Sequence, residues 1–89
     1  MIEDLTLLLG NLMALENERA ERSINDELDA LVELPAHMIL VSNEVGMGVV
    51  PPFPLGRLFR DILGRVNQRV AAQCDEAYFL VAGVPMRLK

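Results

Sequence analysis

The chain has 89 residues, enough for one domain and too few for two. Its net charge of −5 argues against nucleic acid as the main partner, because binding to phosphate backbones requires clustered Lys and Arg. The single cysteine excludes an internal disulfide and no apolar run approaches the roughly 18 residues of a membrane helix, so we expect a cytoplasmic protein without a membrane partner.

The apolar content is high for such a short chain. Apolar residues make up 52% of the sequence, and the aromatic ones are only three Phe and one Tyr. A small domain of this composition has difficulty covering its own core. We therefore expect further burial against a partner or another copy of the chain.

Two amphipathic helices are predicted in the first part of the chain. The first has apolar residues at helical spacing, Leu5, Leu8, Leu9, Leu12 and Met13. Leu7 and Leu15 lie off this stripe, so we expect the helix to be covered on more than one side. After a charged stretch, 16–22, which is typical of a solvated helix face or loop, a weak capping box at Ser23 and Asp26 precedes a second stripe, Ile24, Leu28, Leu31 and Val32. Pro35 should end that helix.

The second part alternates strands with a long helix. Residues 38–41 are short, apolar and partly β-branched, which predicts a strand buried on both faces. A long amphipathic helix should follow the prolines of 51–54 and extend from 55 to 73. Residues 77–81 predict a second buried strand, 83–85 a turn, and 86–89 an antiparallel edge strand.

This order of elements is typical of an α/β protein with helices flanking a mostly parallel sheet. Only two central strands are evident, and a parallel sheet of two strands is not stable alone in water. The sequence therefore predicts a single partial domain over 1–89, the later part of a larger α/β domain.

The candidate site follows the strand at 38–41. Ser42, Asn43 and Glu44 come at its carboxyl end, where open α/β sheets bind ligands. Glu44 could hold a metal or orient a hydroxyl, and Asn43 could donate hydrogen bonds to a ligand. The alternative is that both satisfy backbone groups in a strained turn, with Gly46 and Gly48 supplying positive φ angles.

Other chemistry-bearing residues are few. Glu3 and Asp4 precede a helix and could bind Mg²⁺ near phosphates, or could simply decorate the positive end of that helix. Arg60 is a candidate for contacting a phosphate, whereas the other arginines of the long helix (Arg57, Arg65 and Arg69) should be exposed or paired with Asp61. One histidine and one cysteine are too few for a His/Cys metal site. We expect His37 to be a surface residue and Cys74 to be a small packed side chain. Residues 46–50 read GMGVV, with no lysine to reach a phosphate, so they form neither a phosphate loop nor a dinucleotide fingerprint.

Several stretches together resemble one enzyme family. Residues 41–51 read VSNEVGMGVVP and look like the V-S-N-E-V-G-x-G-[IV]-V-P signature of bifunctional adenosylcobinamide kinase/adenosylcobinamide-phosphate guanylyltransferases of cobalamin biosynthesis. Residues 59–68 resemble that family's F-R-D-x-x-G-x-x-N-Q helix, and 82–85 with Lys89 its G-[IVL]-P ending. Residues 3–12 resemble its [DE]-C-[LV]-T…N-L segment, with Asp4 where the family has Cys.

The resemblance implies a P-loop-type three-layer domain of about twice this length. Such enzymes phosphorylate adenosylcobinamide and then transfer GMP to that phosphate through a histidine-linked intermediate, using GTP or ATP with Mg²⁺. The phosphate loop and the histidine belong to the N-terminal half, and His37 does not match that histidine. By resemblance Glu3 is the acid near the nucleotide and metal, Asn43 and Glu44 belong to the active-site wall, and the oligomer is a trimer.

Two hypotheses follow for the chain itself. It is a C-terminal half of this enzyme, either truncated or one subunit of a split enzyme whose complementary N-terminal half is another chain, or it is a non-catalytic remnant that serves as a self-assembling interaction module. In either case we expect the chain alone to bind no nucleotide and to be inactive. An unrelated small α/β binding protein is a third alternative, disfavoured by the length of the motif match.

Overall fold

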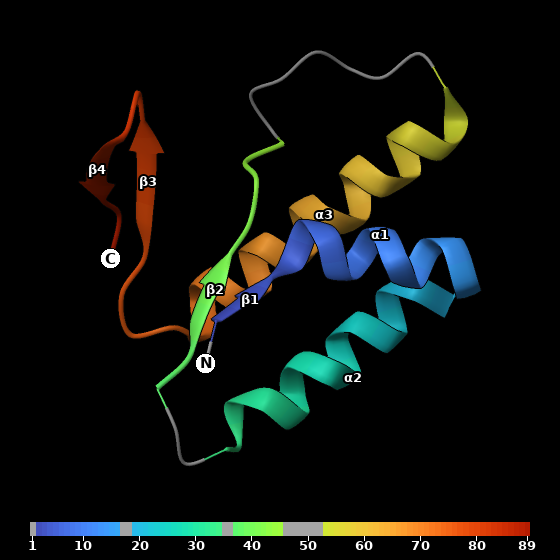
Figure 1. The fold of residues 1–89 in the computed structure, drawn as a ribbon, viewed down its shortest axis with the longest axis horizontal. Coiled ribbons are helices and arrows are strands. Elements are labelled where there is room, and N and C mark those ends of the chain that lie inside the picture. Colours follow the sequence, from blue (N-terminus) through green and yellow to red (C-terminus); the bar gives the residue numbers. More distant parts are fainter. Residues whose placement is uncertain (1, 17–18, 35–36, 46–52) are drawn as a thin grey trace.

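The computed structural model describes residues 2–16, 19–34, 37–45 and 53–89. The elements in chain order are β1 (Ile2–Asp4), α1 (Leu5–Glu16), α2 (Ala20–Val32), β2 (Ile39–Val41), α3 (Pro54–Gln73), β3 (Tyr78–Val81) and β4 (Val84–Arg87) (Figure 1). The predicted turn glycines Gly46 and Gly48, like Pro35, lie outside the described residues. The predicted α/β class and the long third helix are both confirmed. None of the helices described is long and apolar enough to cross a membrane.

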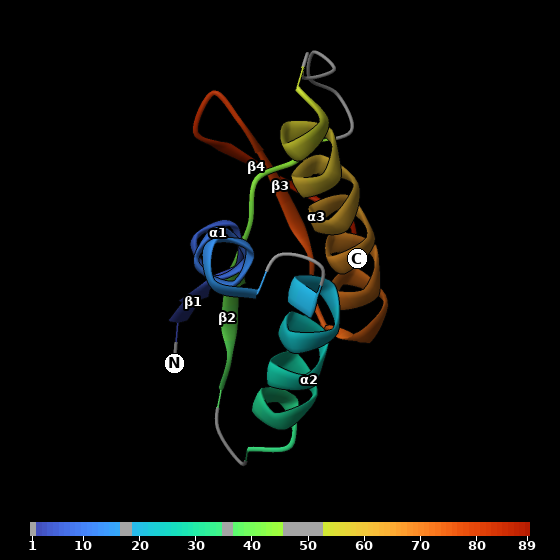
Figure 2. The ribbon, with the colours of Figure 1, turned by 90° about the vertical axis from the view of Figure 1, so that its right-hand side faces the viewer.

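The three helices pack around one small core. Figure 2 looks along α1 and shows α2 and α3 beside it. Each helix contributes buried apolar side chains: Leu5, Leu9, Ala20, Ile24, Leu28, Ile62, Leu63 and Val66. The expectation that α1 is covered on more than one side is wrong for this chain, since Leu7 and Leu15 are 64% and 83% exposed. The core packs on the side of α1 that carries Leu5 and Leu9, and α3 also approaches α1 at Gly10, which leaves Leu7 and Leu15 exposed in the described structure.

Helix α2 begins earlier than its sequence predicted. It starts at Ala20 with Arg19 as N-cap, and the Arg19 side chain makes no capping hydrogen bond. Ser23 therefore lies inside the helix, and the predicted capping box with Asp26 is wrong. Ala20 is fully buried in the core, so packing of the first turn outweighs a weak capping signal.

Strands β1 and β2 form a short parallel pair. Glu3 lies opposite Leu40 in the register. The sequence did not predict β1, which has two acids in three residues and is held as a strand by its partner. Leu40 packs against the helical core, whereas Ile39 and Val41 remain 56% and 49% exposed. The prediction of a strand buried on both faces is therefore wrong here: in the described chain the helices cover the Leu40 side only.

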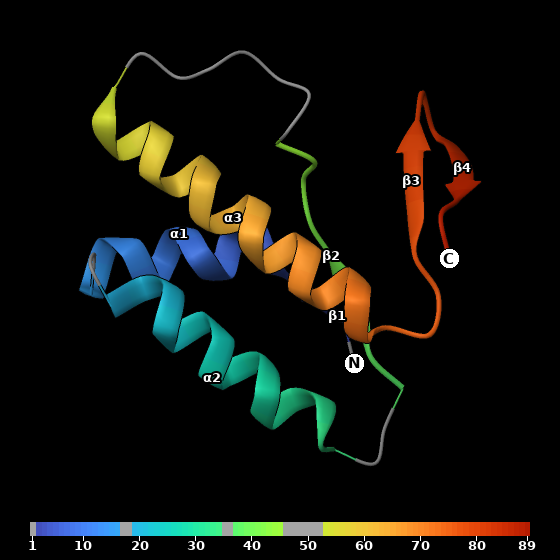
Figure 3. The same ribbon diagram turned by 180° about the vertical axis from the view of Figure 1, so that it is seen from behind.

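The C-terminal strands form a separate antiparallel hairpin. The predicted antiparallel return strand exists, but it covers Val84–Arg87 and not 86–89, because the turn lies at Ala82 and Gly83, which adopt φ angles of 51° and 76°. The hairpin stands away from the helices (Figures 1 and 3), and β3 is largely exposed instead of buried. Among the described residues β3 pairs with β4 and not with β2, so no single larger sheet is formed.

Candidate functional site at the strand edge

The carboxyl ends of β1 and β2 lie at the same edge because the two strands are parallel. Residues 42–45, which we call the edge segment, continue from β2 without regular pairing. The backbone N–H of Asn43 in this segment donates to the Thr6 Oγ1 at 3.1 Å. The first turn of α1 therefore holds the segment from one side, through a residue that the sequence analysis did not single out.

Helix α3 holds the edge segment from the other side. Arg60 Nε donates to the Val45 carbonyl oxygen at 3.0 Å. Asn67 Nδ2 donates to the Asn43 carbonyl oxygen at 2.9 Å, and its Oδ1 accepts a hydrogen bond from the Ser42 hydroxyl. Positions 60 and 67 are two helical turns apart and thus share one face of α3.

Gly64 lies between these two residues on the same face. A Cβ built on Gly64 would lie 3.7 Å from Cγ2 of Val45, so the helix and the edge segment approach closely at this point. The glycine, arginine and asparagine of the 59–68 motif therefore share a common structural task. Their i, i+4, i+7 spacing was the signal that could have revealed this from sequence.

The side chains of Asn43 and Glu44 are both exposed at this edge. Other residues satisfy both backbone groups of Asn43: Thr6 binds the N–H and Asn67 binds the carbonyl. The structure thus brings the two predicted site residues to the strand edge, next to Ser42. Their chemical role stays a prediction.

The two acids of β1 have different surroundings. Asp4 Oδ1 accepts hydrogen bonds from the backbone N–H groups of Thr6 and Leu7, at 3.0 and 3.2 Å. Asp4 therefore caps α1, where a carboxylate also interacts favourably with the helix dipole. This is the simpler of the two interpretations offered for the acids, and for Asp4 it is confirmed. Glu3 is half-buried on the strand face that it shares with Leu40.

Two observations concern the predicted site for a nucleotide with Mg²⁺. Two of the backbone amides in the first turn of α1, those of Thr6 and Leu7, donate to Asp4. Within the part of the chain that the structure describes, no three His, Cys, Asp or Glu residues are grouped so as to hold a metal ion. The assignment of Glu3 to nucleotide and metal stays a prediction.

Two of the four arginines of α3 form ion pairs with α2. Arg65 contacts Glu21 through two hydrogen bonds, at 2.7 and 2.9 Å, and Arg69 contacts Asp29 at 2.5 Å. The hydrogen bonds from Arg65 hold the pKa of the Glu21 carboxyl below its ordinary value, against the opposing effect of burial. The expected pairing partner Asp61 contributes only a longer-range attraction to Arg65.

Arg60, His37 and Cys74 each have a definite place. The guanidinium of Arg60 binds a backbone carbonyl, so the proposed phosphate contact gains no support. His37 is exposed ahead of β2, as expected. Cys74 is half-buried at the end of α3, and its Sγ donates to the Ala71 carbonyl oxygen at 3.3 Å.

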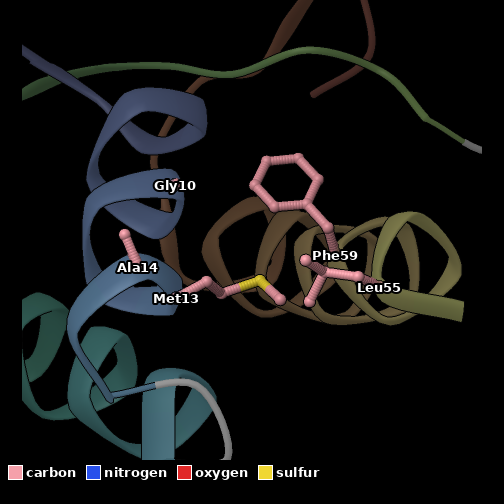
Figure 4. A pocket seen from close by; sticks show the side chains of 5 residues that line it. All are labelled: Gly10, Met13, Ala14, Leu55 and Phe59. Carbon is pink, nitrogen blue, oxygen red and sulfur yellow. The ribbon is translucent and has the colours of Figure 1, made fainter.

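An apolar pocket of about 240 Å³ lies between α1 and the start of α3. Figure 4 shows Leu55 of α3 next to Met13 of α1, with the Phe59 ring above them. Gly10 and Ala14 complete its lining. A Cβ at Gly10 would lie 4.0 Å from the Phe59 ring, which is an ordinary van der Waals distance. Among the described residues, those that line the pocket are all apolar and none belongs to the edge segment.

Comparison with known proteins identifies the family. The sequence model of the family described as "Cobinamide kinase / cobinamide phosphate guanyltransferase" matches residues 1–88. The chain belongs to this family.

Curated relatives agree with this assignment. The chain is 43% identical to a protein of Salmonella typhimurium named bifunctional adenosylcobalamin biosynthesis protein CobU, over all of this chain and 57% of that protein. It is 47% identical to the Escherichia coli protein of the same name, over 78% of this chain and 40% of the relative. The Pseudomonas aeruginosa protein CobP is 42% identical, over all of this chain and 52% of its own length. The chain thus spans about half the length of the curated relatives it matches.

Proposed function

We propose that this chain contributes the edge segment and its supporting helices to a bifunctional cobinamide kinase and cobinamide-phosphate guanylyltransferase. The observation that carries the proposal is the arrangement of the signature residues. Ser42 and Asn43 follow a parallel strand, and the edge segment that they begin is held by Arg60 and Asn67 of the second family motif. Two motifs that are separate in the sequence therefore build one strand-edge site, where α/β folds bind their ligands.

In this proposal the nucleotide, GTP or ATP with Mg²⁺, binds mainly to a part that these 89 residues do not contain, because they include no G-x-x-x-x-G-K-[ST] sequence. The exposed apolar side chains Ile39 and Val41 support docking of such a part, in the same chain or in another one. The assembled protein would be the three-layer P-loop-type domain, cytoplasmic and oligomeric, with adenosylcobinamide as substrate.

A chimera tests this function directly. The part of the Salmonella relative that this chain does not cover is joined to the chain, and GTP-dependent phosphorylation of adenosylcobinamide and GMP transfer are measured. We expect activity from the chimera and none from the 89 residues alone. Calorimetric titration of the chain alone with Mg-GTP should show no binding in the low micromolar range. A folded but inactive chimera that still self-assembles would favour a non-catalytic interaction module instead.

Glu44 provides the sharpest single variant in that chimera. Glu44→Gln keeps the size of the side chain and removes its charge. If Glu44 acts on the reacting groups, activity should fall by on the order of a hundredfold, the usual scale for a positioned acid or base, with little change in melting temperature. Survival of activity with a loss of stability above about 1 kcal/mol would instead identify Glu44 as a structural residue of the turn.

A further inference from the structure

We infer that Asn67 is a positioning residue of the strand-edge site: its amide group immobilises the edge segment and thereby fixes the directions in which the Asn43 and Glu44 side chains project. The consequence for catalysis rests on the proposed function. The immobilisation itself is a property of this chain and can be measured without any activity.

Both ends of the Asn67 amide are used. Nδ2 donates to the Asn43 carbonyl oxygen at 2.9 Å, and Oδ1 accepts from the Ser42 hydroxyl at 2.5 Å. A hydroxyl can donate or accept, but a carbonyl oxygen can only accept. The carbonyl of Asn43 therefore determines which end of the amide is the nitrogen, and the Ser42 hydroxyl then donates to the oxygen.

The side chain that forms this clamp is attached to a rigid element. Asn67 follows Val66, which is 1% exposed, and lies one turn after Leu63, which is fully buried. These residues anchor the middle of the 20-residue helix α3 in the core. Functional groups are held most accurately when their supports are locked by packing of this kind.

The edge segment depends on such support because it has left the regular strand pairing. Its backbone groups need partners outside a ladder. Asn67 and Arg60 bind the Asn43 and Val45 carbonyls from α3, and Thr6 binds the Asn43 N–H from α1. Because two helices hold the backbone of Asn43, the Cα positions from which the Asn43 and Glu44 side chains project are fixed. A displacement of about 1 Å in such a constellation can cost on the order of a hundredfold in rate.

Hydrogen exchange of backbone amides in the 89-residue chain tests the clamp. Asn67→Ala removes both hydrogen bonds of the amide, and we expect the Asn43 N–H to exchange about tenfold faster, although Asn67 does not touch that N–H. The buried amide of Leu63 should change much less. Gln73→Ala, which removes an exposed amide from the last turn of α3, is the matched control. Exchange at Asn43 no faster than in the control would overturn the inference.

Two gentler variants keep the test decisive if Asn67→Ala does not fold. Asn67→Asp preserves the size of the side chain and the acceptor for Ser42, but replaces the donor to the Asn43 carbonyl with an oxygen. Ser42→Ala removes only the other hydrogen bond. We expect faster exchange at Asn43 in both, with the larger change in Asn67→Asp. Unchanged exchange in both would contradict the clamp.

The catalytic consequence is measured in the chimera. Asn67→Asp should lower kcat at least tenfold with KM for GTP within about twofold, since the edge segment orients reacting groups and does not bind the nucleotide. A purely structural role would lower the melting temperature and leave kcat of the folded enzyme unchanged, and that result would overturn the positioning role. If the unmodified chimera is inactive, the proposed function fails, while hydrogen exchange still decides whether the clamp exists.

Discussion

The helical core with its strand edge and the C-terminal hairpin are held together in different ways. In the described part of the chain the three helices bury eight apolar residues among themselves, and side chains of α1 and α3 hold the edge segment on top of that core. The hairpin of β3 and β4 exposes most of its apolar side chains, including Leu80 and Met86 at 64% and 54%. Its ties to the rest are polar: the Lys89 ammonium donates to the carbonyl oxygens of Ala71 and Ala72 at the end of α3.

This difference indicates which part of the chain is self-sufficient. A core with fully buried leucines and satisfied strand-end carbonyls can define a geometry by itself. A two-stranded hairpin is at best marginally stable alone and gains its stability from whatever covers its apolar faces. The strand-edge site therefore belongs to the part of the chain that the core determines, and the hairpin belongs to the part that depends on further contacts.

The largest expected effect is the difference in stability between truncating a side chain in the helical core and truncating one in the hairpin. Leu63→Ala removes a side chain that is 0% exposed, and we expect a loss of about 2–5 kcal/mol in the free energy of unfolding. Leu80→Ala removes the same atoms from a residue that is 64% exposed, and should cost less than about 1 kcal/mol. Urea unfolding of both variants gives the comparison. Equal losses would mean that the hairpin is as well packed as the helices.

A smaller effect should be confined to the hairpin. Lys89→Met removes the ammonium that binds the last carbonyls of α3, where a positive charge is also favoured by the helix dipole. We expect a local loss of about 0.5–1 kcal/mol, seen as faster amide exchange at Ala77, whose N–H bonds to the Lys89 carbonyl. Leu63 should stay unchanged. Arg22→Met removes the same charge from an exposed position of α2 and should leave Ala77 unaffected.

The smallest effect concerns the ion pair between α2 and α3. The pKa of Glu21 is lowered by Arg65, so its contribution is present above the ordinary carboxyl value of 4.5 and is lost as the pH falls through the lowered folded-state value. Because both side chains are partly exposed, the pair contributes only about 0.5 kcal/mol. Glu21→Gln should therefore be less stable than the natural chain by about that amount near pH 7, with the difference shrinking as the pH falls below the ordinary carboxyl value.

Two controls define this last comparison. Glu27→Gln removes the same charge from an exposed position of the same helix and is the matched control for the loss of stability near pH 7. High salt should shrink the Glu21 effect, since it screens exposed charges. A Glu21→Gln difference that grows as the pH falls would contradict the assignment of the lowered pKa.

The local pattern of apolar and turn residues was sufficient to predict most of the helices and the final turn. The helical spacing of apolar residues predicted α1 and α3 closely, and the Gly83 region predicted the final turn. The prediction of a parallel sheet with helices on both faces was less successful, because pattern shows that Ile39 and Val41 are apolar but not which neighbours cover them. Strand β1 was missed for a related reason: Ile2–Asp4 forms a strand through pairing with β2 and has no strand pattern of its own.

The sequence by itself determined the family, the helical stripes and the position of Ser42, Asn43 and Glu44 after a strand, since these depend on residues that are adjacent or regularly spaced. Only the tertiary structure decided what holds that site. Asp4 became the cap of α1, Arg60 bound a backbone carbonyl, and Asn67 reached back 24 residues to the carbonyl of Asn43. Such contacts join distant parts of the chain through single hydrogen bonds, and they exist only after the burial of Leu9 and Leu63 has brought α1 and α3 together.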